Sequence, residues 1–221
     1  EKKNQIFASY NNHESYKNLP AKIKEKKNII FFKLNLLDSN EKIIKTLEEL
    51  KVDINIIINA VGGSFGVKEY PYDYENWLKI LNLNILKHIH INNFFINKMI
   101  KKKFGRILFF STSAVEDKNS PIAYSAAKAF LENYVVKSAN FLGNHNVLIN
   151  CIKTSVIAAK NNNWFKALEQ KPEFVEDFAK KYISVERIGK FEDLVDYIDL
   201  IISEKNKFMN GSVVRIDGGL K

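Results

Sequence analysis

A tyrosine and a lysine are the two residues whose types and spacing best suit them to acid–base chemistry. Tyr124 and Lys128 stand in "YSAAK", which opens a small-residue segment expected to be helical. Residues four apart on a helix share one face. A lysine ammonium ~4 Å from a phenol, at an effective dielectric constant of about 20, favours the phenolate by roughly 4 kcal/mol, or on the order of 3 pKa units. We therefore expect the pKa of Tyr124 to be lowered toward neutral pH, where the residue can act as a general acid or base.

Three hydroxyl side chains precede this pair in the sequence. Ser111, Thr112 and Ser113 follow the apolar run "RILFF", which is typical of a buried strand. A hydroxyl at the end of such a strand can hydrogen-bond to a substrate oxygen while Tyr124 transfers a proton to it, so that the adjacent carbon can accept a hydride from a cofactor. Serine and threonine are also common in turns and helix N-caps, so these residue types alone leave both roles open.

The elements that must position these residues form an alternating pattern of strands and helices. Short apolar runs bounded by polar stretches alternate with segments of helical period, which is typical of a parallel sheet covered by helices on both faces. We expect one doubly wound, Rossmann-like α/β domain with three α/β/α layers over residues 1–221. The expected strands are residues 5–10, 29–34, 54–59, 106–111, 147–152 and 212–217.

The helical segments add two expectations. The helix after the second strand should begin at Asp38 as N-cap, with Glu41 completing a capping box. Residues 72–103 form a long helical stretch with Asn84 on or beside its apolar face, which is a costly place for an amide without partners. Residues 160–185 interrupt the strand–helix rhythm after a strand end, where ligands bind in open α/β sheets, and we expect a substrate lid there.

Composition limits the classes of protein that fit. The 221 residues carry a net charge of +9, which suits a phosphate-bearing cofactor or an anionic substrate. The basic runs lack interleaved aromatic residues, so no nucleic-acid partner is expected. No apolar stretch is long enough to span a bilayer, and we expect a cytoplasmic protein without a membrane partner. Cys151, the single cysteine, should be a buried inert thiol, and His88 and His90 point to different helix faces, so no metal is expected.

Five blocks in order along the chain resemble the short-chain dehydrogenase/reductase family. They are "INAVGGS" at 58–64, "WLKILNLNIL" at 77–86, "GRILFFSTSA" with "YSAAK", "ERIGKFEDL" at 186–194 and "MNGSVVRIDGG" at 209–219. The resemblance implies hydride transfer between NAD(P) and a carbonyl or secondary alcohol. It also implies assembly into a homodimer or homotetramer through the helices at 72–103 and 123–142.

The same resemblance implies roles for particular residues. Tyr124 is the expected acid/base, Lys128 lowers its pKa and holds the nicotinamide ribose, and Asn84 anchors a water of a proton relay. The substrate hydroxyl is Ser111 by its spacing from the tyrosine and Thr112 by ungapped alignment of the strand; we favour Ser111. The expected cofactor contacts, besides Tyr124 and Lys128, are Asn35, Asn59, Ala60, Gly62 and Ile157, and the expected substrate contacts are Ser111, Thr112 and Ser113.

Several departures from the family pattern affect the cofactor site. Val61 stands where a glycine is usual, and Gly62 and Gly63 are expected to take over its conformational role. Thr154 and Ser155 replace a Pro-Gly pair, which suggests the alternative of a catalytically weak or inactive scaffold that serves as a binding or regulatory module. Trp164 and Phe165 either line the substrate pocket or pack within the lid.

The chain also begins with polar residues that lead directly into its first expected strand, without the glycine-rich turn that cradles pyrophosphate. We therefore expect the natural chain to carry about 30 more N-terminal residues, one strand–helix unit. The segment "SYNNHES" has no acid before Glu14 to bind a ribose 2′-hydroxyl. This absence weakly favours NADP over NAD.

Overall fold

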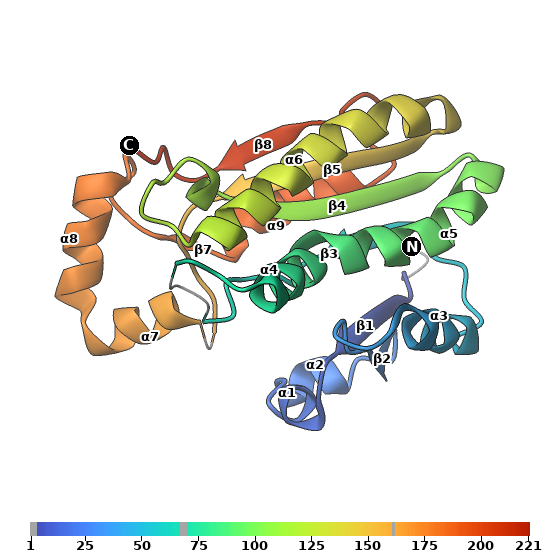
Figure 1. The fold of residues 1–221 in the computed structure, drawn as a ribbon, viewed down its shortest axis with the longest axis horizontal. Coiled ribbons are helices and arrows are strands. Elements are labelled where there is room, and N and C mark those ends of the chain that lie inside the picture. Colours follow the sequence, from blue (N-terminus) through green and yellow to red (C-terminus); the bar gives the residue numbers. More distant parts are fainter. Residues whose placement is uncertain (1–3, 67–69, 161) are drawn as a thin grey trace. The chain divides into compact units, whose positions relative to one another are not determined.

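The computed structural model describes residues 4–66, 70–160 and 162–221. The chain divides into two compact units, Glu1–Val52 and Asp53–Lys221, and each is described by itself (Figure 1). The candidate catalytic residues all belong to the second unit. The expectation of a single domain over residues 1–221 stays a prediction.

The described residues of the first unit form a parallel pair of strands and three helices. Strands β1 (Ile6–Tyr10) and β2 (Ile29–Lys33) pair in register from Ile6 opposite Ile29 to Tyr10 opposite Lys33. The connection between them contains α1 (His13–Lys17) and α2 (Ala21–Lys24), and α3 (Asn40–Glu49) follows β2. Both strands lie within the expected ranges.

The N-cap predicted for α3 was wrong by one residue. Ser39, and not Asp38, is the N-cap, because its backbone is extended and its hydroxyl accepts the Lys42 N–H at 3.3 Å. Asp38 instead pairs with the Lys42 ammonium at 2.9 Å.

The second unit is built on a four-stranded parallel sheet of order β3-β4-β5-β8. The strands are β3 (Ile56–Asn59), β4 (Gly105–Thr112), β5 (Val147–Thr154) and β8 (Val213–Ile216), and each overlaps an expected strand. The central strands are buried on both faces and carry long apolar runs, as the sequence pattern predicted. Because all four strands are parallel, their carboxyl ends lie at one edge, where Thr112 pairs with Thr154.

Helices cover both faces of this sheet (Figure 1). Leu108 on β4 packs against Leu194 and Ile201 of α9 (Glu192–Ile202). The next residue, Phe109, faces the opposite side, where it makes edge-on ring contacts with His88 and Tyr134. The three-layer α/β/α arrangement is confirmed, since successive strand residues point to opposite faces.

The helices on the face of Phe109 are long. The segment expected at 72–103 consists of α4 (Tyr74–Leu81), a π-helical turn (Asn82–Leu86) and α5 (Lys87–Lys102), and it is followed after β4 by α6 (Ile122–Leu142). Short 3₁₀ turns at Ser113–Val115 and Gly143–His145 follow β4 and α6.

Two further helices and a small strand pair follow β5. Helices α7 (Asn163–Gln170) and α8 (Pro172–Tyr182) occupy the segment expected to be a lid. The short strands β6 (Ile157–Ala158) and β7 (Gly189–Lys190) pair in parallel on either side of it, which the sequence pattern did not predict. No helix in the described part of the chain has the length and apolar character that a membrane crossing would need.

Candidate active site

At the end of β4, the hydroxyls of the neighbouring residues Ser111 and Thr112 lie on opposite faces of the sheet. Ser111 is buried, and its hydroxyl donates to the Glu132 carboxylate at 2.5 Å. Thr112, the next residue, contacts the Tyr124 hydroxyl and accepts the Ala114 N–H at 3.2 Å. The structure therefore brings Thr112, and not Ser111, into contact with Tyr124.

An ion-pair cluster of the buried Lys153 with Glu132 and the exposed Glu116 holds Ser111 in that orientation. The Lys153 ammonium lies 2.6 Å from Glu116 and 3.1 Å from Glu132, and only 4% of its side chain is exposed. Hydrogen bonds to both carboxylates raise its pKa against the opposing effect of burial. Since a buried charge without partners is costly, Lys153 keeps Glu132 in place as the acceptor of the Ser111 hydroxyl.

Tyr124 and Lys128 lie one turn apart near the start of α6, as their spacing predicted. The Lys128 ammonium donates to the Phe110 carbonyl oxygen at 2.8 Å and lies 5.9 Å from the centroid of the Tyr124 ring. Only 5% of Lys128 is exposed, and burial lowers its pKa to about 8.

The expected lowering of the Tyr124 pKa is wrong for this structure. Burial raises the pKa of Tyr124 above its ordinary value, and its hydrogen bond with Thr112 opposes the rise only in part. The expectation counted only the attraction of an ammonium ~4 Å from the phenol at an effective dielectric constant of about 20, whereas here the loss of hydration of the phenolate dominates.

Asn84 is fully buried in the π-helical turn, and three hydrogen bonds of 2.9 Å satisfy its amide. Its side-chain oxygen accepts the Gly63 N–H, and its nitrogen donates to the carbonyls of Gly63 and Ile80. These partners explain how an amide is tolerated on the apolar face of the helix. Asn84 therefore fixes the segment Val61–Gly63 that follows β3, while its expected role as the anchor of a relay water stays a prediction.

Gly62 lies directly against the side chains of Asn84 and Lys128. A Cβ at Gly62 would lie 2.7 Å from the Asn84 side-chain oxygen and 3.0 Å from the Lys128 nitrogen. A larger residue therefore cannot occupy the position without displacing one of them, and Val61 is tolerated because its side chain points outward and is half exposed.

His88 is a residue of this site that the sequence did not single out for chemistry. Its Nε2 lies 2.9 Å from the Val61 carbonyl and 3.2 Å from the Leu83 carbonyl, so this nitrogen bears hydrogen and donates to both. Burial lowers the pKa of His88 to about 4, which keeps the ring neutral. His88 and Asn84, four residues apart, thus hold the same segment from one side.

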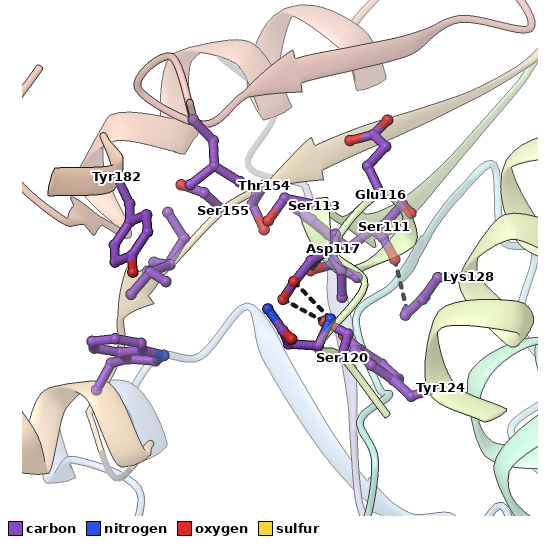
Figure 2. Close-up of a pocket in the computed structure, with 18 of the residues that line it drawn as sticks. Ser111, Ser113, Glu116, Asp117, Ser120, Tyr124, Lys128, Thr154, Ser155 and Tyr182 are labelled. Carbon is purple, nitrogen blue, oxygen red and sulfur yellow. Dashed lines mark hydrogen bonds between the residues drawn. The ribbon is translucent and has the colours of Figure 1, made fainter. Parts of the chain in front are cut away.

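A cavity of about 1240 Å³ lies beside Thr112, Tyr124 and Lys128 (Figure 2). Its lining includes Ala60, Gly62, Ser111, Thr112, Ser113, Tyr124, Lys128 and Ile157 from the predicted site, together with Trp164. Asn59 is buried behind it, with its amide 3.4 Å from the Leu108 carbonyl. Asn35 belongs to the first unit, where its side-chain oxygen accepts the Leu37 N–H at 3.0 Å.

The lining also contains residues that the sequence did not assign to the site. They are Glu116, Asp117, Lys118, Asn119, Ser120, Phe174, Phe178, Tyr182 and Arg215. Arg215 stands on β8, the other polar members stand in the loop between β4 and α6, and the aromatic members stand on α8. Their positions beside the Ser-Thr-Ser cluster and in the expected lid were the only available signals.

Comparisons with known proteins agree with this arrangement. A family model described as enoyl-(acyl carrier protein) reductase matches residues 1–221. The 3-oxoacyl-[acyl-carrier-protein] reductase FabG of Buchnera aphidicola subsp. Schizaphis graminum is 25% identical over 205 residues, 88% of this chain and 79% of that protein.

Two solved structures show the same fold. The 3-oxoacyl (acyl-carrier-protein) reductase from Agrobacterium tumefaciens C58, with NADP bound, is 18% identical with a TM-score of 0.83, over 97% of this chain and 83% of that chain. A 3-oxoacyl-[acyl-carrier protein] reductase from Brucella melitensis, with NAD bound, is 18% identical with a TM-score of 0.73, over 87% of this chain and 71% of that chain.

Proposed function

The chain belongs to the short-chain dehydrogenase/reductase family and is an NAD(P)-dependent oxidoreductase of that type, and we propose that Tyr124 is its acid/base. The reaction interconverts a carbonyl compound and the corresponding secondary alcohol. The observation that carries the proposal is the convergence of Tyr124, Thr112 and Lys128 on one cavity beside Gly62.

The residues around this cavity fit a nicotinamide cofactor. The Lys128 ammonium has three N–H groups, and the Phe110 carbonyl takes one of them, so others can bind ribose hydroxyls. Gly62 admits close approach of a ligand to the backbone, and Ile157 lines the same cavity. We assign Ala60, Gly62, Tyr124, Lys128 and Ile157 to this contact.

When bound, the cofactor supplies or accepts the hydride. The chain's own residues handle the proton and the substrate oxygen. Tyr124 donates a proton to the carbonyl oxygen in reduction and removes it from the alcohol in oxidation. In reduction, the products are thus an alcohol and the oxidised cofactor.

We assign the orienting hydroxyl to Thr112. Its oxygen accepts the Ala114 N–H, so its own hydrogen can be donated to a substrate oxygen beside Tyr124. The Ser111 hydrogen is already donated to Glu132. The earlier preference for Ser111 remains the alternative, and Ser113 is assigned to the substrate wall.

Lys128 and Asn84 assist Tyr124 without being its direct proton partners. Lys128 places a positive charge on the same side of α6 as Tyr124. Asn84 holds Gly63 at both its N–H and its carbonyl, which fixes the segment that covers Lys128. The proposed relay through an Asn84-bound water would return the proton of Tyr124 to solvent through Lys128.

The remaining assignments extend this function. Asn59 would contact the adenosine half of the cofactor, the expected contact of Asn35 in the first unit stays a prediction, and NADP is preferred weakly over NAD because no acid precedes Glu14 after β1. We further propose a cytoplasmic homodimer or homotetramer. Light scattering of the purified protein measures its mass, and a monomer at micromolar concentration would contradict the assembly.

The test is turnover by the wild type and by Tyr124→Phe. Oxidation of NADPH and NADH is followed with sugar, acyl and small-ketone substrates, and cofactor binding is titrated in parallel by fluorescence. We expect Tyr124→Phe to bind cofactor like the wild type and to lose at least 100-fold in kcat, since general acid catalysis contributes about 10²–10⁴-fold. Wild-type cofactor binding without turnover of any substrate would instead support the inactive scaffold.

A further inference from the structure

Four aromatic side chains of the segment expected to be a lid line the cavity that contains Tyr124. This aromatic wall consists of Trp164 on α7 and Phe174, Phe178 and Tyr182 on α8. The α8 members recur every four residues and therefore share one face of the helix. Trp164 stacks on Phe174 at 6.3 Å and 12° between ring planes and lies 4.6 Å from Phe178, which is 5.0 Å from Tyr182.

Packing within the protein accounts for only part of this wall, since Trp164 and Phe178 pack against the apolar cluster beneath α8 whereas Phe174 and Tyr182 do not. The core-facing side of α8 is supplied by Val175 and Ala179, which are buried together with Ile183. Phe174 remains 56% exposed and Tyr182 40% exposed, although both stand in a concave site. Apolar surface left open in a cavity favours a ligand that covers it.

The loop between β4 and α6 lines another part of the same cavity with polar groups. This polar wall consists of Ser113, Asp117, Asn119 and Ser120. The Asp117 carboxylate accepts the Asn119 N–H and the Ser120 hydroxyl, both at 2.9 Å, which gives the loop a defined shape. Figure 2 shows Asp117 and Ser120 near Tyr124, with Tyr182 across the pocket from them.

A ligand that satisfies both walls must have an apolar face and a polar edge. A flat aromatic or alkyl ketone would cover the aromatic wall, but it would remove water from the polar wall without replacing the lost hydrogen bonds, which is unfavourable. A saturated sugar ring presents C–H groups on its faces and hydroxyls around its edge. The cavity volume of about 1240 Å³ is large enough for such a ring beside a nicotinamide.

We propose that the substrate is a carbohydrate derivative whose ring stacks on the aromatic wall while its hydroxyls bind the polar wall. The inference rests on the proposed function and names the substrate class of that site. In the oxidative direction, a ring carbon bearing a hydroxyl loses hydride to NAD(P)⁺ and the hydroxyl loses its proton to Tyr124, so that a keto sugar forms.

The experiment compares substrate classes in one assay. NAD(P)H formation is measured with a panel of aldoses, amino sugars and methyl glycosides, with 1-phenylethanol, and with 2-butanol and 2-octanol. The variants are Phe174→Leu for the aromatic wall and Asn119→Ala for the polar wall. Phe208→Leu is the matched control, because Phe208 is 98% exposed and does not line the cavity.

The expected result is turnover of at least one sugar with a higher kcat/KM than any other alcohol. Phe174→Leu should raise KM for that sugar about five- to tenfold, the loss expected for one ring contact. Asn119→Ala should raise it by a similar factor, whereas kcat for 2-butanol should change less than about twofold in both variants. Phe208→Leu should behave as the wild type.

The other outcomes count against the inference in distinct ways. Preference for 1-phenylethanol or 2-octanol, with Phe174→Leu impaired and Asn119→Ala unchanged, would overturn the carbohydrate and leave the oxidoreductase intact. Equal impairment on 2-butanol would show that the two variants disturb catalysis in general. Failure to oxidise or reduce any compound would count against the proposed function itself.

Discussion

Removal of the Thr112 hydroxyl should show which of the two candidate hydroxyls, that of Thr112 or that of Ser111, binds the substrate oxygen. Thr112→Val keeps the side-chain shape but removes the group that contacts the Tyr124 hydroxyl. Loss of one donor aimed at a reacting oxygen costs about 10²–10³ in kcat, or ~2.7–4 kcal/mol. We therefore expect Thr112→Val to lose at least 100-fold in kcat, and Thr112→Ser to recover most of it.

The matched variant is Ser111→Ala. It removes a hydrogen bond to Glu132, but Glu132 keeps its contact with Lys153. A hydrogen bond to a charged group contributes about 1.5–3 kcal/mol, and the partial exposure of Glu132 reduces this to about 1 kcal/mol of folding stability. Activity should stay within about threefold of the wild type, since the Ser111 hydroxyl is not available to the substrate.

The two variants are assayed by steady-state carbonyl reduction and by urea denaturation. The urea midpoint measures the stability change, and kcat and KM measure the contact with substrate. If Ser111→Ala lost 100-fold in kcat while Thr112→Val kept its activity, the assignment from side-chain direction on β4 would be wrong. Such a result would favour the spacing rule that selects Ser111.

Three further predictions concern buried groups. Folding lowers the His88 pKa from 6.5 to about 4, so between these pH values only the unfolded chain takes up a proton at His88. The free energy of unfolding should therefore decrease by up to about 3 kcal/mol as the pH is lowered from 6.5 to 4. His88→Gln should lose this part of the pH dependence of the urea midpoint. Burial raises the Cys151 pKa to about 12, so a thiol reagent at pH 8 should label it only as the protein unfolds, and fast labelling of the folded protein would contradict the burial. Gly62→Ala brings a Cβ within 2.7 Å of Asn84 and 3.0 Å of Lys128, and kcat should therefore fall about tenfold or more. An unchanged kcat would show that the backbone at Val61–Gly63 shifts without cost.

The strands and the proximity of Tyr124 to Lys128 were predictable from local patterns. The apolar runs at β4 and β5 identify buried parallel strands because both of their faces are covered. The spacing of Tyr124 and Lys128 places them together because helix geometry relates residues four apart. These predictions needed no knowledge of partners distant in the sequence.

The choice between Ser111 and Thr112 was not predictable in this way. Counting back from Tyr124 assumes a fixed length for the loop at 113–121, and a difference of one residue there moves the count to the opposite face of β4. The register of β4 supports the proposed assignment to Thr112, because Thr112 lies opposite Thr154 at the end of β5. The partners of Ser111 lie on α6 and β5, and no local pattern indicates that pairing.

The electrostatics of Tyr124 and Lys128 also depend on burial, which could not be predicted from the sequence. The ammonium of Lys128 has a pKa lowered to about 8, so near that pH it is charged in only about half of the molecules. Lys128 therefore stabilises a Tyr124 phenolate less than a fully charged ammonium would. Burial further disfavours the charged form of Tyr124. The resting state is a neutral phenol, hydrogen-bonded with Thr112, with a shielded amine one turn away. A neutral phenol is the proton donor that carbonyl reduction requires, whereas alcohol oxidation must first deprotonate it. A protonated Tyr124 suits reduction, and oxidation should become easier as pH rises.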